Sequence, residues 1–528
     1  MTTSNLGWYK FQVVGQPDST FTVARIDGVE RLGSPYRFEL DLVSESVDID
    51  LQALLGKTAQ LNMRPWGANE VFFHGVITQS RSSQALAERK LMYHVRLEPR
   101  LALLGQSTLN EAYVDTANGL NLKNLIDSVF ARHGLLPGKD YSLALGSPII
   151  SRDFVLQYQE TDLAFLNRWV EFEGAFYYFS QEVSGEKVIF IDDIQSLPVK
   201  RVALKYRPAG SMTVDQYTSS LIEFDEWQAV GVGKVRYQEH NYRQAQDPVT
   251  GSAQNAQSFW TTQLFYGGGL RDNAQANAYA KLRLEAFDAQ RDTRHGKLLA
   301  TGVSPGTIIS VTQHPRQRLN AEFLVTTVRH KGTQAGFGVT TDLVGQGITE
   351  QNYYTAEFDA VPSNKPYRLP LQTPRPHIAG YLPALVDAEG EGQVAFIDQY
   401  GRYKVDLPFD FSDRGAGMAS AWVRLAAPFN GPGDKGNAGF HFPLRKGAEV
   451  MLAFMDGDPD LPVIVGVLTN SLSPSPVNDH NASVHRIVSG AGHEFHMDDT
   501  PGSEGVRIKS SDNGSMILIG TYGGGTGK

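Results

Sequence analysis

The residues most capable of chemistry are three aspartates at alternate positions, Asp456, Asp458 and Asp460. Carboxylates with this spacing open a calcium-binding loop, which also needs a glycine at its sixth position and a bidentate glutamate at its twelfth. Leu461 and Val467 occupy those two positions. The segment is therefore predicted to be a plain turn.

Two histidines, His493 and His496, form a second candidate site. Residues three apart on a strand point to opposite faces, so the two side chains cannot hold one metal ion within a single chain. Three copies of one histidine meeting on a trimer axis stay open as an alternative. The glycines at 231–233 lack the spacing of a phosphate loop. We predict no catalytic residue, metal ion or cofactor.

The composition limits the class of protein. With 528 residues, 41% of them hydrophobic and 20% charged, the chain is long enough for several domains with cores of their own. A formal net charge of −9 argues against nucleic acid as a partner, because phosphate binding needs clustered lysine and arginine. Cysteine is absent, which excludes disulfides and thiol nucleophiles. No signal peptide is predicted, and no apolar run reaches the roughly 20 residues of a membrane span.

Alternating apolar and polar residues between turns predict a mainly β chain with helical insertions. From Tyr9 to Glu98 the short runs are typical of an antiparallel barrel or sandwich. Helices are expected at 121–132, 161–174 and 273–291, where apolar residues recur at helical spacing. Further strands are expected at 175–179, 307–312 and 323–328. These blocks suggest a base of two related β-domains.

A hairpin is predicted at 449–467, where two β-branched runs flank Gly457 and Pro459. Together with strands expected at 392–397, 403–407 and 421–425, it makes a small barrel of the OB type. The segment from Gly380 to Asn470 carries twelve acidic and seven basic side chains, so its net charge is negative. A groove that binds single-stranded nucleic acid needs a positive charge. A carbohydrate-binding OB module stays an alternative.

The C-terminal residues form short alternating segments around Phe495, Val506 and Met516. Three strands of this length bury too little apolar surface to be stable alone, and their open edges need partners. Identical chains wound into a prism would close those edges, so a homo-oligomer is predicted. Both faces of the last strand are apolar, which indicates a tip that docks a capping protein or a well-packed final strand. The residues of this tip are Met516, Ile517, Leu518 and Ile519.

Six motifs in this order resemble VgrG spike proteins, and they cover nearly the whole chain. They are Tyr158–Phe179, the set Pro305–Gly306, His314–Pro315 and Phe323–His330, then Thr373–Gly380, Gln399–Arg402, Ser420–Arg424 and Gly457–Asp460. Each motif alone is weak, but their order is specific. The family resembles the hub and spike of phage T4 baseplates fused in one chain.

The resemblance implies a domain order. Residues 1–360 would form a hub-like base with two β-barrel domains and α+β inserts, 361–376 a proline-rich linker, and 377–470 the OB domain. Residues 471–484 would be a second linker, and 485–528 a short β-prism needle. The implied fold class is mainly β with α+β inserts: tandem barrels, an OB barrel and an intertwined triple-stranded β-helix.

The resemblance also implies a function. The protein would be a non-enzymatic, homotrimeric spike at the tip of a contractile injection system, adapting a hexameric inner tube to a membrane-piercing needle. Its partners would be the tube protein, baseplate proteins, a PAAR-like tip cap and, transiently, the target membrane. It would be assembled in the bacterial cytoplasm and leave as part of a secreted or extracellular particle.

Two departures from the family pattern are present. Leu407–Asp410 replaces a His-Trp-Asp pattern, and the needle segment ends at Lys528, earlier than in most type VI secretion spikes. The short needle favours spikes of extracellular contractile injection systems, such as antifeeding-prophage and virulence-cassette particles. Residues 471–484 leave no room for the lysozyme domain of the phage spike. A cell-envelope hydrolase acting on peptidoglycan is kept as the functional alternative.

Overall fold

The computed structural model describes residues 7–87, 90–114, 119–182, 185–195, 199–208, 220–255, 260–335, 352–388, 394–412, 420, 422–434, 436–512 and 514–520. The chain divides into two compact units. Unit 1 comprises Met1–His377, Phe409–Ser412 and Asp458–Leu461. Unit 2 comprises Ile378–Pro408, Asp413–Gly457 and Pro462–Lys528.

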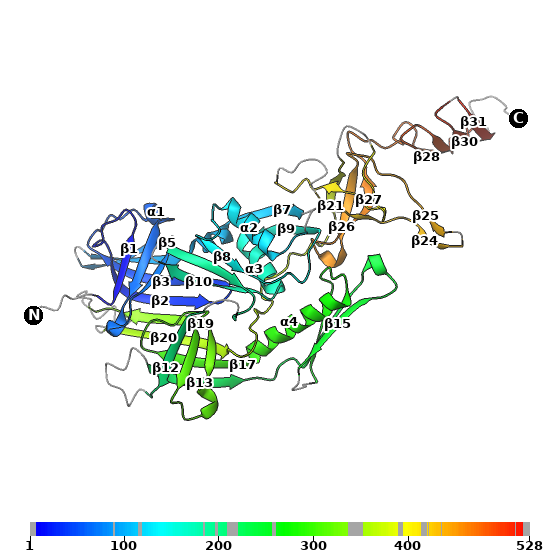
Figure 1. Ribbon diagram of the computed structural model, residues 1–528. Coiled ribbons are helices and arrows are strands. Elements are labelled where there is room, and N and C mark those ends of the chain that lie inside the picture. Colours follow the sequence, from blue (N-terminus) through cyan, green and yellow to red (C-terminus); the bar gives the residue numbers. More distant parts are fainter. Residues whose placement is uncertain are drawn as a thin grey trace, which may run out of the picture. The chain divides into compact units, whose positions relative to one another are not determined.

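Unit 1 contains a large twelve-stranded sheet (Figure 1). Among the described residues its twelve strands lie in the order β1 (Tyr9–Val13), β4 (Thr58–Met63), β5 (Val71–Ala87), β6 (Lys90–Glu98), β3 (Ser34–Ser44), β2 (Thr22–Arg31), β19 (Glu322–Thr333), β18 (Ile308–Thr312), β12 (Arg201–Tyr206), β13 (Ser220–Gln228), β17 (Asp292–Leu298) and β20 (Tyr353–Pro362). β20 also pairs with β19, which closes the last six strands of this order into a barrel. β2 pairs with β19 and so joins this barrel to the first six strands. The predicted mainly β fold with a barrel is confirmed.

The core of this sheet follows from period-two alternation along its strands. In β1, Tyr9, Phe11 and Val13 are buried, whereas Lys10 is exposed. Phe38 of β3 packs against Phe73 of β5 with ring centroids 4.4 Å apart. Apolar side chains from both halves of the sheet join the same core.

An insertion of helices and strands packs around a second core in unit 1. It contains α2 (Leu122–Arg132) and α3 (Asp162–Phe172), a sheet of β10 (Phe176–Glu182), β11 (Gly185–Ile191) and β8 (Tyr141–Ala144), and the pair β7 (Thr108–Val114) and β9 (Phe154–Thr161). Local signals fix both helices: the Asn121 side chain accepts from Asn124 N at 3.2 Å, and Thr161 Oγ1 accepts from Ala164 N at 3.1 Å. Both helices were predicted from the sequence, and both are confirmed.

The third predicted helix is α4 (Asn273–Arg291), also in unit 1. It covers one face of a three-stranded sheet, β15 (Val249–Gln254), β14 (Lys234–Glu239) and β16 (Thr262–Tyr266). Tyr279 and Ala280 of α4 are fully buried against Val235 of β14. Shorter helices are α1 (Leu51–Leu54) and the 3₁₀ turns η1 (Pro65–Gly67), η2 (Arg100–Gln106), η5 (Tyr242–Gln244) and η6 (Gln317–Leu319). No helix within the described ranges is long and apolar enough to cross a membrane.

Unit 2 begins with a five-stranded sheet in the order β22 (Val405–Asp406), β21 (Leu382–Val386), β26 (Glu449–Phe454), β27 (Pro462–Leu468) and β23 (Arg424–Leu425). The predicted hairpin is confirmed, since β26 and β27 pair antiparallel from Glu449 opposite Leu468 to Phe454 opposite Pro462. Its turn contains η7 (Met455–Gly457), with positive φ at Asp456 and Gly457. A further hairpin, β24 (Asn430–Gly433) with β25 (Gly436–Gly439), was not predicted.

Several predicted strand boundaries in unit 2 are wrong. The strand expected at 392–397 is reduced, within the described part, to isolated bridges at Val394 and Ile397. The strand expected at 403–407 shortens to Val405–Asp406, because Tyr403 forms only isolated bridges. β21 was not expected, since Pro383 interrupts its short apolar run. The linker at 361–376 stays a prediction, and β20 of unit 1 extends to Pro362.

Candidate assembly surface

The last four strands of unit 2 form an antiparallel sheet of their own. They are β28 (Val484–Val488), β29 (Glu494–Asp498), β30 (Gly505–Lys509) and β31 (Met516–Gly520), paired in sequence order (Figure 1). β28 was missed in the sequence, which indicated three strands here. Gly492 and Gly502 lie in the connecting turns with φ of 88° and 84°, a conformation that glycine adopts without steric cost.

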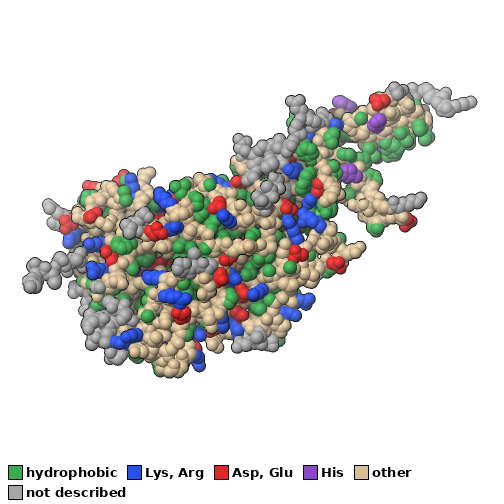
Figure 2. Space-filling model, viewed as in Figure 1, with side chains coloured by type: hydrophobic (Ala, Val, Ile, Leu, Met, Phe, Trp, Pro, Cys, Tyr) green, Lys and Arg blue, Asp and Glu red, His purple; other side chains and the backbone are tan. Residues whose placement is uncertain are grey.

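One face of this sheet is apolar. The register places Phe495 opposite both Ile487 and Ile508, and Ile508 opposite Ile517. Because side chains alternate along a strand, one face carries Ile487, Phe495, Met497, Val506, Ile508, Ile517 and Ile519, with His485 at its margin. The six largest of these hydrophobic residues are exposed, from 36% at Met497 to 66% at Ile519. Figure 2 shows hydrophobic side chains gathered on the C-terminal part of the chain. We call these seven residues the apolar face.

The opposite face carries a charged network centred on Glu494. Its carboxylate accepts hydrogen bonds from Arg486 Nε at 2.6 Å and from Arg507 Nη2 at 2.9 Å, and Nδ1 of His496 lies 3.1 Å away. Burial of the carboxyl acts to raise its pKa, but hydrogen bonds from His496, Arg507 and Arg486 outweigh burial and lower the pKa to about 2. The network therefore ties β28, β29 and β30 together with an ionised carboxylate.

The four residues predicted as a tip form β31, and the structure divides them between the two faces. Ile517 and Ile519 lie on the apolar face, opposite Ile508 and Val506. Met516 and Leu518 lie on the charged face, opposite Lys509 and Arg507. All four residues are exposed, from 44% at Leu518 to 66% at Ile519. They therefore offer two separate surfaces instead of one.

The aspartates considered for a calcium loop are not part of this sheet. The predicted turn is present, and Asp458 and Asp460 belong to unit 1, where each carboxylate lies 2.7 Å from Nη2 of Arg375. Asp460 also accepts a hydrogen bond from Leu156 N at 2.7 Å. Across the ranges described above, no cluster of three or more histidine or carboxylate side chains could hold a metal ion.

The two histidines bind different partners. His496 is buried in the charged network, whereas His493 precedes β29 and its Nδ1 accepts from Ser511 N at 3.2 Å. The network itself was missed in the sequence. Arg486, Glu494 and Arg507 lie in three consecutive strands, and this pattern could have indicated the network. It does so only when the register is known, because the register decides which side chains are neighbours.

A sheet with one exposed apolar face is suited to association. Exposed apolar patches that are contiguous mark interaction sites, because covering each large side chain contributes about 1.5–3 kcal/mol. The opposite, charged face remains compatible with water. The arrangement can therefore join copies or partners through one face while the other stays in solvent.

The comparisons with known proteins agree on the family. The model of the phage tail baseplate hub (GPD) family matches residues 29–336, more than half of the chain. The chain belongs to this family. A second model, the type VI secretion system/phage-baseplate injector OB domain, matches residues 394–468 of this chain. The OB barrel predicted from the sequence is confirmed.

The chain is a homologue of VgrG spike proteins. It is 30% identical over 505 residues to the type VI secretion system spike protein VgrG5 of Pseudomonas aeruginosa, covering 92% of this chain and 62% of that protein. It is 27% identical over 515 residues to VgrG1a of the same organism, covering 94% and 76%. The chain thus spans about three fifths of the length of VgrG5.

Solved structures share the fold of this chain. An E. coli component of the type VI secretion system, described as structurally similar to the T4 bacteriophage tail proteins gp27 and gp5, matches with a TM-score of 0.61 and 23% identity, covering 87% of this chain and all of that one. A chain of the Francisella PdpA–VgrG complex matches with a TM-score of 0.61 and 10% identity, covering 97% of this chain and 86% of that one. At these identities the matches show the fold alone.

Proposed function

We propose that this baseplate hub protein is the homotrimeric spike of a contractile injection system. Three copies would pack the apolar faces of their β28–β31 sheets together and form a needle. The exposure of the apolar face, up to 66% at Ile519, is the observation that carries this proposal. The homology to VgrG spike proteins supports it.

The base would adapt a hexameric inner tube to this needle. Each chain arranges its large sheet as two sets of six strands joined by the β2–β19 pairing. Three such chains would present six comparable sets around one axis, which suits a six-fold tube. Other baseplate proteins would surround the base, and the assembled particle would contact the target membrane briefly. Assembly in the bacterial cytoplasm, and an extracellular particle as its destination, stay predictions.

Met516 and Leu518 would dock a PAAR-like tip cap. If the apolar face is used between copies, Ile517 and Ile519 are covered in the trimer. Met516 and Leu518 lie on the other face and would stay available. This division narrows the docking residues from four to two.

A structural role without catalysis fits the buried carboxyls. Burial raises the pKa of Glu160, Glu173 and Glu239, a property that acids in active sites also have. Each of the three is nevertheless bound by the protein: Glu160 by Arg168, Glu173 by the Tyr279 hydroxyl at 2.8 Å, and Glu239 by Gly269 N at 2.9 Å. The alternative, a peptidoglycan hydrolase, predicts a cleared band in a zymogram with the purified chain.

The solution mass of the full chain, and of a chain ending at Asn481, tests the trimer. Light scattering should give a trimer for the full chain. A lower mass for the shortened chain would assign the association to β28–β31, whereas an unchanged trimer would assign it to the rest of the protein. A monomeric full chain at micromolar concentration would overturn the proposal.

A further inference from the structure

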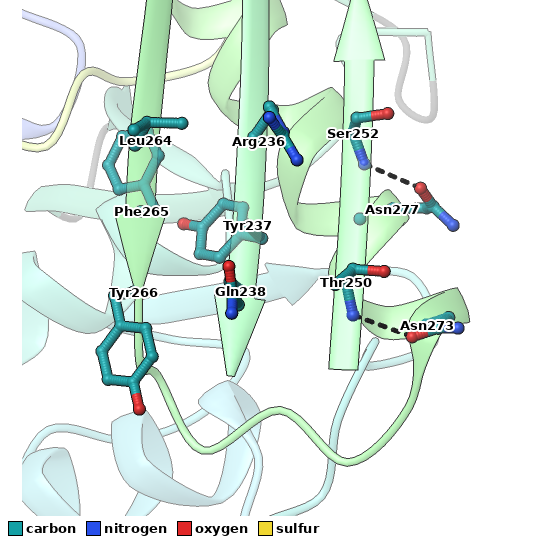
Figure 3. A pocket seen from close by; sticks show the side chains of 11 residues that line it. Arg236, Tyr237, Gln238, Thr250, Ser252, Leu264, Phe265, Tyr266, Asn273 and Asn277 are labelled. Atoms are coloured by element: carbon teal, nitrogen blue, oxygen red, sulfur yellow. Dashed lines mark hydrogen bonds between the residues drawn. The ribbon is translucent and has the colours of Figure 1, made fainter. Parts of the chain in front are cut away.

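The two edges of the sheet formed by β15, β14 and β16 differ in whether their outward main-chain groups are hydrogen-bonded. β15 pairs antiparallel and β16 parallel with the central strand β14 (Figure 3). One face packs on α4, and Gly251 lies so close to that helix that an added Cβ would be 2.2 Å from the Ala276 backbone. The other face is exposed at Arg236, Gln238 and Ser252. The sheet is therefore held firmly on one face and open on the other.

Two asparagines of α4 accept hydrogen bonds from the outward amides of the edge strand β15. Asn273 Oδ1 accepts from Thr250 N at 2.8 Å, and Asn277 Oδ1 accepts from Ser252 N at 2.9 Å (Figure 3). Four residues of a helix and two residues of a strand both span about 6–7 Å, so the side chains match the outward amides one to one. This edge has no free amide for another strand at these two positions.

At the other edge, the outward amides and carbonyls of β16 have no such partner within the described part of the chain. The Thr261 carbonyl accepts from Lys234 N at 3.0 Å, and Gly267 N donates to the Gln238 carbonyl at 3.1 Å. In a parallel ladder this places the odd-numbered groups of β16 toward β14 and turns the amides and carbonyls of residues 262, 264 and 266 outward. Those groups have no hydrogen-bond partner among the residues described. Leu264 and Tyr266 are 72% and 64% exposed.

A groove of about 570 Å³ lies on the exposed face of this sheet and is lined by residues of all three strands, including Leu264 and Tyr266 of β16. Among the described residues that line it, Arg236 alone is charged, and Lys234 lies two residues earlier on the same face of β14. Neither side chain has an ion pair with another described residue. This face therefore carries two basic side chains on a chain whose formal net charge is −9.

We propose that the edge of β16 binds an extended, acidic segment of a partner protein by strand addition. Outward amides and carbonyls of residues 262, 264 and 266 would supply main-chain hydrogen bonds, which give affinity in this mode of recognition. Arg236 and Lys234 would select acidic side chains on the exposed face, and Leu264 and Tyr266 would flank them. An unsealed edge beside exposed apolar side chains is a feature that proteins normally cover, so a partner is expected there.

Two labelled decapeptides test the proposal on the full chain: one alternates glutamate and valine, the other lysine and valine. Fluorescence anisotropy should show saturable binding of the acidic peptide and much weaker binding of the basic one. Leu264→Pro removes one outward amide without touching the ladder to β14, and should weaken binding about tenfold or more, since strand addition through that position is blocked. Leu264→Ala, the matched control, keeps the amide and should stay within about threefold.

Other outcomes overturn the proposal. Equal binding of the two peptides, no binding of either, or no difference between Leu264→Pro and Leu264→Ala would exclude an acidic strand at this edge. A fall in solution mass with Leu264→Pro, without peptide binding by the parent chain, would assign the edge to a contact between copies. Should Leu264→Pro fail to fold, the double variant Arg236→Glu with Lys234→Glu still decides, because exchanging both basic side chains for acidic ones must reverse the preference toward the basic peptide.

Discussion

Arg168 holds Glu160 through two guanidinium nitrogens in the interior of unit 1. Nε lies 3.0 and 2.9 Å from the two carboxylate oxygens, and Nη2 lies 2.8 Å from Oε1. Only 6% and 7% of the two side chains are exposed. Because Glu160 is the last residue but one of β9 and Arg168 lies on α3, the pair fixes the turn from strand to helix.

Arg168→Met should destabilise unit 1 by about 3–5 kcal/mol, because it leaves a buried carboxyl without its partner. Arg168→Met combined with Glu160→Leu should recover much of that loss. Thermal unfolding followed by tryptophan fluorescence would measure both. Arg243→Met is the matched control, because its pair with Asp153 is more exposed and should matter by about 1 kcal/mol or less. Equal losses for Arg168→Met and Arg243→Met would contradict the structural role of the buried pair.

The two faces of β31 should respond differently to a charge. Ile517→Asp places a carboxylate on the apolar face and should convert the trimer to monomers, because several buried apolar contacts would be replaced by a desolvated charge. Met516→Asp, on the charged face, should leave the mass unchanged. Light scattering at equal protein concentrations distinguishes them. Dissociation by both variants would mean that the faces are assigned wrongly.

Acid should weaken the C-terminal sheet over a defined range. The pKa of Glu494 is about 2, below its ordinary value of 4.5. A carboxyl with a lowered pKa stabilises the folded state above its unfolded pKa, and this contribution is lost as pH falls from about 4.5 to about 2. The protection factors of β28–β30 amides, which correct the exchange rate for its intrinsic pH dependence, should therefore fall in this range.

Glu494→Gln should remove most of that pH dependence and cost about 1.5–3 kcal/mol at neutral pH, because the hydrogen bonds lose their charge. Asp479→Asn changes an exposed carboxylate in the preceding segment and is the control. If Glu494→Gln keeps the acid response of the parent chain, the network does not govern it.

Cap binding should depend on Leu518. Leu518→Asp should abolish co-purification of a PAAR-like cap while the trimer persists, since Leu518 lies on the face that stays available. Lys509→Ala changes a neighbouring strand on the same face and should retain the cap. A cap that still co-purifies with Leu518→Asp would place its docking site elsewhere.

The helices were predictable because their signals are local. Asn121 and Thr161 cap α2 and α3 as the sequence indicated, and apolar residues recur within one or two turns. The same holds for the hairpin of β26 and β27, whose turn lies within a few residues of both strands. Such elements need no knowledge of distant partners.

Elements that depend on distant partners were not predictable. β21 contains Pro383, and its pairing with β26 joins residues more than sixty positions apart. The site was predicted in part: the apolar character of Met516–Ile519 was visible, but their division between two faces follows from the register with β30. The position of Glu494 between Arg486 and Arg507 likewise requires two registers at once.

The asparagines on β15 have a consequence for self-association. Edge-to-edge polymerisation needs two receptive edges on every sheet, one to accept a strand and one to offer the next. Asn273 and Asn277 occupy one of them. Two copies joined through β16 would stop at a pair, so this sheet cannot seed a growing fibre.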